Sequence, residues 1–237
     1  MTDPGRREEL ALRLAEVRGR IAKACEAAGR DVSELTLIAV TKTRPASDVR
    51  LLSDLGVTDF GENRDAEAAP KAAECAALGL AGLTWHFIGQ LQTNKCASVA
   101  RYAHVVHSVD RLRLIGALGQ AARRAGRVIE CLVEVSLDGD PARGGAVAEE
   151  VPALAEALAA EEGLVLGGVM AVAPLGMPPA DAFARLRVSA AAVREVRPEA
   201  TVISAGMSGD LEAAVEAGAT HLRIGTALLG DRGPRVG

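Results

Sequence analysis

Eight short apolar segments recur along the chain, and segments with a helical pattern separate them. The apolar segments are rich in Val, Ile and Leu, as is typical of strands that are buried on both faces. Regular alternation of strands and helices predicts a parallel sheet, and eight strands favour a closed barrel. The predicted strands cover residues 35–41, 57–60, 84–88, 104–109, 128–137, 164–172, 201–205 and 221–225.

Apolar residues at helical spacing also precede the first strand, over residues 6–28, and Gly29 follows them as a helix-ending residue. The alternative is an open, doubly wound sheet, which would carry a glycine-rich fingerprint directly after the first strand, and none is present. We therefore predict that residues 1–237 form one domain, a single (β/α)8 TIM barrel with an extra N-terminal helix. Asp110 is predicted to cap the helix that follows the fourth strand.

The composition excludes several classes of protein. The formal net charge of −4 comes without a dominant basic block, which argues against a nucleic-acid surface. No long apolar stretch and no secretory signal pattern is present, so we expect a cytoplasmic protein without a membrane segment. The four cysteines form no CxxC pair, and neither a metal site nor a disulfide framework is expected. These cysteines are Cys25, Cys75, Cys96 and Cys131.

Lys42 lies directly beyond the first buried strand, where a barrel has its functional face. Desolvation at such a place lowers the pKa of an amine and makes it a nucleophile that forms a Schiff base with an aldehyde or ketone. The alternative is a lysine that reaches solvent or pairs with a carboxylate. Neighbouring features have to decide between the two.

Two glycine-containing turns follow the seventh and eighth strands, where barrels commonly bind phosphate. The first contains Gly206 and Ser208, and the second contains Gly225 and Thr226. Each turn taken alone could need its glycines only for a tight bend. Together with Lys42 they indicate a phosphorylated aldehyde held as a Schiff base, and pyridoxal 5′-phosphate is the commonest such molecule.

Arg223, in the eighth strand, limits the chemistry of such a cofactor. If Arg223 faces the pyridine nitrogen, it can only donate a hydrogen bond, because a guanidinium has no acceptor. The ring nitrogen then stays unprotonated, and the ring is a weaker electron sink than one paired with a carboxylate. The alternative is an internal ion pair between Arg223 and Asp or Glu.

Five segments stand out, in order and over essentially the whole length of the chain: residues 39–45, 60–63, 85–95, 206–208 and 223–227. Together they resemble the pyridoxal phosphate homeostasis protein family. The resemblance implies an alanine racemase N-terminal-like barrel that takes part in intracellular vitamin B6 homeostasis, with no established catalysis. It also implies that Lys42 holds pyridoxal 5′-phosphate as a Schiff base, that Asn63 and Arg223 flank the ring, and that Ser208, Gly225 and Thr226 hold the phosphate.

Two positions depart from the family pattern. Arg44 stands where a second lysine is common, and Arg143 lies near another position that often carries a lysine. An arginine forms no Schiff base, so a transfer step would have to do without a second amine or use Lys95. Pyridoxal phosphate-dependent apo-enzymes are the partners that the resemblance suggests, and we expect a monomer.

Two enzymatic functions remain as alternatives. A pyridoxal phosphate-dependent amino-acid racemase usually needs a proton carrier on each face of the ring, and Tyr102 is the only tyrosine. A Schiff-base aldolase would act on sugar phosphates without a cofactor. His86, within an apolar strand, is interpreted as a hydrogen-bonded core residue.

Overall fold

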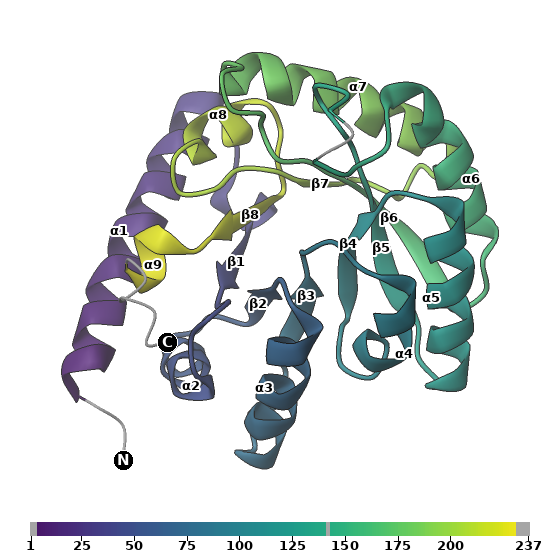
Figure 1. The fold of residues 1–237 in the computed structure, drawn as a ribbon. Coiled ribbons are helices and arrows are strands. Elements are labelled where there is room, and N and C mark those ends of the chain that lie inside the picture. The colour runs from purple at the N-terminus through teal and green to yellow at the C-terminus, as the bar shows by residue number, and fades with distance from the viewer. Residues whose placement is uncertain (1–3, 141–142, 231–237) are drawn as a thin grey trace.

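The computed structural model describes residues 4–140 and 143–230. Its centre is a closed barrel of eight parallel strands that follow one another in chain order, and β8 pairs with β1 to close it (Figure 1). The predicted barrel is therefore confirmed. The strands are β1 (Thr36–Val40), β2 (Asp59–Glu62), β3 (Thr84–Phe87), β4 (Val105–Val109), β5 (Ile129–Glu134), β6 (Leu164–Met170), β7 (Val202–Ser204) and β8 (His221–Ile224).

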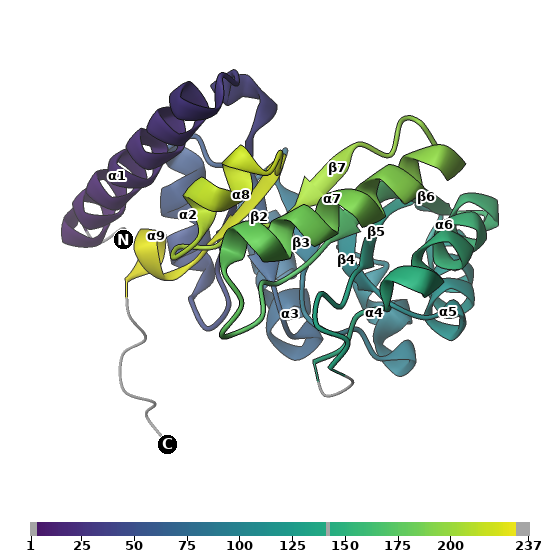
Figure 2. The ribbon, with the colours of Figure 1, turned by 90° about the horizontal axis from the view of Figure 1, so that it is seen from above.

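Helices surround the barrel, and the predicted extra helix, α1 (Pro4–Ala28), lies in this ring between α8 and α2, on the side of β1 and β8 (Figures 1 and 2). It packs against α2, α8 and α9 and ends at Gly29, whose φ is 64°. None of the described helices is long and apolar enough to cross a membrane. The other helices are α2 (Ala46–Asp54), α3 (Asp65–Ala77), α4 (Cys96–Val99), α5 (Leu112–Arg124), α6 (Val151–Ala160), α7 (Pro179–Val196), α8 (Leu211–Glu216) and α9 (Thr226–Leu229).

The apolar core has two parts, because successive residues of a strand point to opposite faces of the sheet. The larger part lies between the strands and the helices and includes Phe60, Val106 and Val133. The smaller part belongs to the other face of the strands, the inside of the barrel, and comes from β4, β5, β6 and β7. It consists of Val105, Leu132 and Met170, with Val202 packed against them.

Several local predictions were wrong, among them the ends of β5 and β6, which lie three and two residues earlier than predicted. Asp110 does not cap α5: the N-cap residue is Arg111, and the Asp110 carboxylate forms an ion pair with its guanidinium instead. Strand β2 begins two residues later than predicted, because the Val57 N–H closes the end of α2 by donating to the Leu52 carbonyl at 3.0 Å. The short helix α9 follows β8 directly and was not predicted.

Candidate functional site

Lys42 lies at the rim formed by the carboxyl ends of the strands, one residue after Thr41 and the end of β1. It is half-buried, so it does not stand in bulk water. β1 pairs with β8 in a register that sets Ala39 opposite Ile224. A Cβ placed on Gly225 would lie only 3.6 Å from the Val40 Cβ. The turn after β8 is therefore the immediate neighbour of the strand end that presents Lys42.

The two predicted phosphate-binding turns are joined. The Ala227 N–H, in the first turn of α9, donates to Ser208 Oγ at 3.2 Å, and Thr226 beside it is exposed. Gly206 has a φ of 91°, and a Cβ there would lie 2.6 Å from the Ala214 Cβ, so only glycine fits. Ser208, Gly225 and Thr226 thus form one surface beside the end of β1.

Arg223 is buried in the barrel interior, at 4% exposure. Its Nη1 donates to Ser204 Oγ at 2.7 Å, and its Nη2 donates to the Ala171 carbonyl at 2.8 Å. Burial lowers the pKa of Arg223 to about 10, which still leaves it charged at neutral pH. Among the described residues no carboxylate lies within ion-pair distance of Arg223, so its neighbours are neutral acceptors.

Asn63 follows β2 and is half-buried. The loop after β3 packs tightly against it, since a Cβ on Gly89 would lie 2.1 Å from the Asn63 carbonyl oxygen. The side-chain Oδ1 of Asn63 is buried and has no hydrogen-bond partner in the described part of the chain. A buried acceptor without a partner costs free energy, so this atom is a candidate for contact with a ligand.

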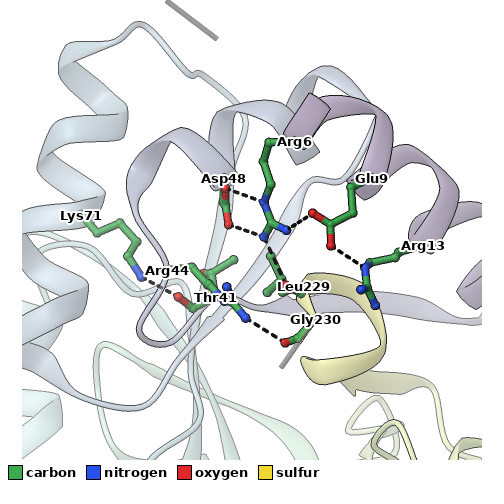
Figure 3. Close-up of polar contacts among 9 residues, drawn as sticks. All are labelled: Arg6, Glu9, Arg13, Thr41, Arg44, Asp48, Lys71, Leu229 and Gly230. Atoms are coloured by element: carbon green, nitrogen blue, oxygen red, sulfur yellow. Dashed lines mark hydrogen bonds and ion pairs between the residues drawn. The ribbon is translucent and has the colours of Figure 1, made fainter. Parts of the chain in front are cut away.

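A buried ion pair beside the Lys42 backbone was missed by the sequence analysis. Lys71 Nζ, on α3, donates to Glu62 Oε1 at 2.5 Å. It also donates to the Thr41 carbonyl at 2.7 Å, the contact drawn in Figure 3. The Thr41 hydroxyl donates to the same Glu62 oxygen at 2.7 Å. Burial raises the pKa of Glu62, although the charge of Lys71 opposes that rise. The pair fixes the peptide immediately before Lys42.

The position of Lys71 in α3 gives the signal that could have revealed it. Ala68, Lys71, Ala72 and Cys75 are the buried residues of this helix, at the spacing of one helical face. A lysine within such a stripe of small residues needs a buried anionic partner. Glu62, at the end of the preceding strand, is the acidic residue nearest to Lys71 in the sequence that is itself buried.

Arg44, two residues after Lys42, supports α9. Its Nη2 donates to the Gly230 carbonyl at 2.8 Å (Figure 3). Arg6 adds a contact from α1 to the Leu229 carbonyl at 3.2 Å and makes a two-point ion pair with Asp48 of α2. Both guanidinium groups thus interact with carbonyls at the C-terminal end of α9, where a positive charge is favourable.

The two other basic residues considered in the sequence analysis lie on the surface. Arg143 is exposed and donates to the Val172 and Ala173 carbonyls at 3.3 and 3.4 Å. Lys95 is exposed at the end of a short 3-10 helix, Thr93–Lys95. In these positions Arg143 braces the loop after β6, and Lys95 belongs to the loop after β3.

The histidines make no metal centre in the described ranges, where no three His, Cys, Asp or Glu side chains converge. The interpretation of His86 as a hydrogen-bonded core residue is confirmed, because it is buried and its Nε2 lies 2.9 Å from Asp59 Oδ1.

Tyr102 lies in a surface depression that also includes Ala72, Trp85 and Arg127. That depression is on the outer side of the barrel, against α3.

Comparisons with known proteins cover nearly the whole chain. Residues 13–233 match the family model described as alanine racemase, N-terminal domain. A pyridoxal phosphate homeostasis protein from Mycobacterium tuberculosis is 45% identical and aligns over 97% of this chain and 95% of its own length. The protein of that name from Escherichia coli K12 is 37% identical, over 94% and 97% of the two chains.

Solved structures show the same barrel. PipY of Synechococcus elongatus, with PLP bound, has a TM-score of 0.81 and 34% identity, and the match covers 93% of this chain and 100% of that chain. Alanine racemase from Corynebacterium glutamicum has a TM-score of 0.67 at 16% identity. The match covers 94% of this chain but only 60% of the racemase, and it shows a shared fold.

Proposed function

Because this chain belongs to the pyridoxal phosphate homeostasis protein family, we propose that it binds pyridoxal 5′-phosphate (PLP) through Lys42 and buffers or delivers it in the cytoplasm, without catalysing a reaction. One observation carries this proposal: the half-buried Lys42 shares a rim with the joined turns at Ser208 and Thr226, and Arg223 lies in the barrel interior. The printed description of PipY with PLP bound supports the choice of ligand.

The residues present fit this ligand. Ser208 Oγ accepts from a backbone N–H, so its own hydroxyl hydrogen is available for a phosphate oxygen. The exposed Thr226 hydroxyl lies beside it. In the described part of the chain Arg223 uses two of its five N–H groups on protein acceptors, which leaves others for a ligand. Asn63 supplies a buried acceptor that lacks a protein partner.

When bound, PLP supplies an aldehyde that condenses with amines and a ring that withdraws electrons. Arg223 would meet the ring nitrogen only as a hydrogen-bond donor, and its charge at neutral pH prevents it from accepting a proton. The buried Lys71 and Glu62 would orient Lys42 through the Thr41 peptide. These residues would bind and orient the cofactor without making the ring a strong electron sink.

The racemase alternative is less well supported by the structure. A two-base racemase needs a second proton carrier on the opposite face of the ring. Tyr102 is poorly placed for this role, because it lies in the surface depression outside the barrel, and burial raises the pKa of its hydroxyl. We therefore propose a carrier, and we expect racemase assays with alanine and other amino acids to give no turnover.

Absorbance gives a direct test of PLP binding through Lys42. The purified protein incubated with PLP should absorb visible light, and borohydride should remove the visible band and leave the cofactor attached to one peptide. Lys42→Ala should lose the band, whereas Lys95→Ala, a matched change of an exposed lysine, should keep it. A wild-type protein that stays colourless with excess PLP, or a Lys42→Ala variant with an unchanged reducible band, would refute the proposal.

Delivery needs a separate experiment. The loaded protein is mixed with a PLP-dependent apo-enzyme, and activation is compared with that by an equal concentration of free PLP in the presence of a PLP-scavenging phosphatase. A carrier should protect the cofactor and still activate the apo-enzyme. Loss of activation in step with the free-PLP control would refute delivery but leave binding intact.

We further propose that the protein works as a monomer, which light scattering would test.

A further inference from the structure

A continuous chain of hydrogen bonds crosses the barrel interior and ends at Arg223. Asp59 Oδ1 lies 2.9 Å from His86 Nε2, and His86 Nδ1 lies 2.9 Å from His107 Nε2. His107 Nδ1 lies 3.0 Å from Ser204 Oγ, to which Arg223 donates at 2.7 Å. The five residues come from β2, β3, β4, β7 and β8, and we call this chain the relay.

The chemistry of the two ends fixes the direction of every bond in the relay. Arg223 can only donate, so Ser204 Oγ accepts from it, and the Ser204 hydroxyl hydrogen must go to His107 Nδ1 or remain unused. Ser204 is fully buried, and an unused buried donor is costly. His107 therefore accepts at Nδ1 and carries its proton on Nε2, from which it donates to His86 Nδ1.

The same reasoning continues to the other end. Because His86 accepts at Nδ1, it carries its proton on Nε2 and donates to the Asp59 carboxylate. Both histidines are then neutral and have the Nε2–H tautomer. Complete burial lowers the pKa of His107 well below its usual range, and the positive charge of Arg223 acts in the same direction. Neutral imidazoles are what the geometry requires.

We propose that Asp59, His86, His107 and Ser204 are positioning residues that hold Arg223 in the orientation in which it meets the ring nitrogen of PLP. This inference rests on the proposed function, because it assigns the target of Arg223. Without the relay, the Ala171 carbonyl would be the only acceptor among the described residues that still bonds the Arg223 guanidinium. Two-point bonding fixes the plane of a guanidinium, whereas one bond leaves it free to rotate.

Protonation of His107 should weaken the relay. A proton added to His107 Nδ1 turns that atom into a donor to Ser204 Oγ, whose own hydrogen then has no acceptor in the relay. Ser204 would accept from two donors, and its bond to Arg223 would weaken. Other groups that act on these imidazoles are His104, Glu130 and His221, which lie on or beside β3, β5 and β8.

The relay can be tested first in the ligand-free protein. Nitrogen-15 NMR distinguishes the two neutral tautomers of histidine from each other and from the cation. We expect His86 and His107 to have the Nε2–H tautomer at pH 7 to 8. Observation of the Nδ1–H tautomer in either residue, or of a charged His107 at that pH, would overturn the relay whether or not the protein binds PLP.

The second test removes one link. Ser204→Ala should disturb the single tautomer of His107, shift the pH dependence of the visible band, and raise the Kd for PLP about tenfold, as expected for a lost hydrogen bond to a charged group. Ser108→Ala is a matched control, because Ser108 is also a buried strand serine but has no hydrogen-bond partner in the described part of the chain. It should leave all three readouts unchanged.

The outcomes separate the two proposals. A wild-type protein that takes up no PLP refutes the proposed function. A wild-type protein that takes up PLP while Ser204→Ala and Ser108→Ala behave alike refutes only the relay. If Ser204→Ala fails to fold, Asp59→Ala breaks the far end of the relay, with exposed Asp54→Ala as its control. Asp59→Ala should alter the His86 and His107 signals and shift the visible band's pH profile, and an unchanged His107 signal would overturn the relay.

Discussion

Replacing Lys71 by Met tests the buried pair that fixes the peptide before Lys42. The side chain of Lys71 is 7% exposed and that of Glu62 is 1% exposed, and their closest atoms are 2.5 Å apart. Met is close to Lys in volume and shape, so the substitution removes the charge with little change in packing. It leaves the Glu62 carboxylate buried, and within residues 4–140 and 143–230 the Thr41 hydroxyl is then its only remaining donor.

The size of the effect follows from the buried charge that is left behind. Removing one partner of a buried ion pair typically costs about 3–5 kcal/mol, and the remaining Thr41 bond places the expected loss near the lower end. For a chain of this size, that loss lowers the melting temperature by roughly 6–12 °C. Lys23→Met changes an exposed lysine of α1 and should shift the free energy of unfolding by less than about 0.5 kcal/mol.

The loss should also depend on pH. Burial already raises the pKa of Glu62, and the loss of Lys71 raises it further because the opposing charge is gone. A carboxyl whose folded-state pKa is raised favours the folded state below its unfolded pKa, and that contribution is lost as the pH rises through the folded-state value. Lys71→Met should therefore be more stable at pH 5 than at pH 8, by about 1.4 kcal/mol for each unit of added pKa shift.

Urea unfolding at pH 5 and at pH 8 measures the loss in the free energy of unfolding and its dependence on pH. Wild type, Lys71→Met and Lys23→Met are compared with the double variant Glu62→Gln/Lys71→Met, which removes the unpaired charge and should recover part of the loss at pH 8. The reasoning is wrong if Lys71→Met loses no more stability than Lys23→Met. It is also wrong if the loss is the same at pH 5 and pH 8.

Three further perturbations test other parts of the structure. Gly89→Ala forces a Cβ against the Asn63 carbonyl, so it should lower the free energy of unfolding by about 1–3 kcal/mol or more and weaken PLP binding. Gly19→Ala adds a Cβ in open space on α1 and should instead raise the free energy of unfolding by about 0.5–1 kcal/mol. Urea unfolding measures both changes. Arg6→Ala removes the ion-pair partner of the buried Asp48 and should lower the free energy of unfolding by about 2 kcal/mol. The loss is smaller than for Lys71→Met because Arg6 is partly exposed. An unchanged melting temperature would contradict this. All four thiols are buried, and burial raises their pKa. An aromatic disulfide reagent at pH 8 should therefore label none of them in the native protein and all four in guanidinium. Rapid labelling of the native protein would contradict their burial. These thiols belong to Cys25, Cys75, Cys96 and Cys131.

The barrel was predictable because its signal is periodic and repeats eight times. Buried parallel strands are predominantly apolar, and a short apolar run recurred eight times although β2, β3, β4, β7 and β8 each also carry a polar relay residue. Helix and strand ends were less predictable, because they depend on single competing contacts. Asp110 has the chemistry of a helix cap, but its carboxylate pairs with Arg111, whose guanidinium also donates to the Leu91 carbonyl at 2.8 Å.

The rim of the site was also predictable in outline. Lys42, Ser208 and Thr226 lie in the segments that follow β1, β7 and β8, and parallel strands bring their carboxyl ends together whatever the register. Contacts that depend on register and on helix placement were not predictable. Lys71 meets Glu62 only because α3 lies back against β2 with one face buried, and no local pattern gives that orientation.

The relay shows the same limit from inside the barrel. His86 considered alone is correctly interpreted as a core residue, and nothing in its own strand identifies its partners. The partners follow from the closed sheet, because β3 adjoins β4, while β7 adjoins β8 and faces them across the interior. A narrow barrel lets short side chains from opposite strands meet, and Ser204 can bond both His107 and Arg223 only for that reason.

The inside of this barrel is thus divided between two kinds of side chain with different tasks. Val105, Leu132 and Met170 fill one part and gain stability from burial. The relay fills another and connects a carboxylate to the guanidinium of Arg223 through neutral groups. Apolar residues at the relay positions would pack as well and would remove the cost of burying Arg223. The polar chain is better explained by the orientation that it gives to Arg223 than by the stability of the barrel.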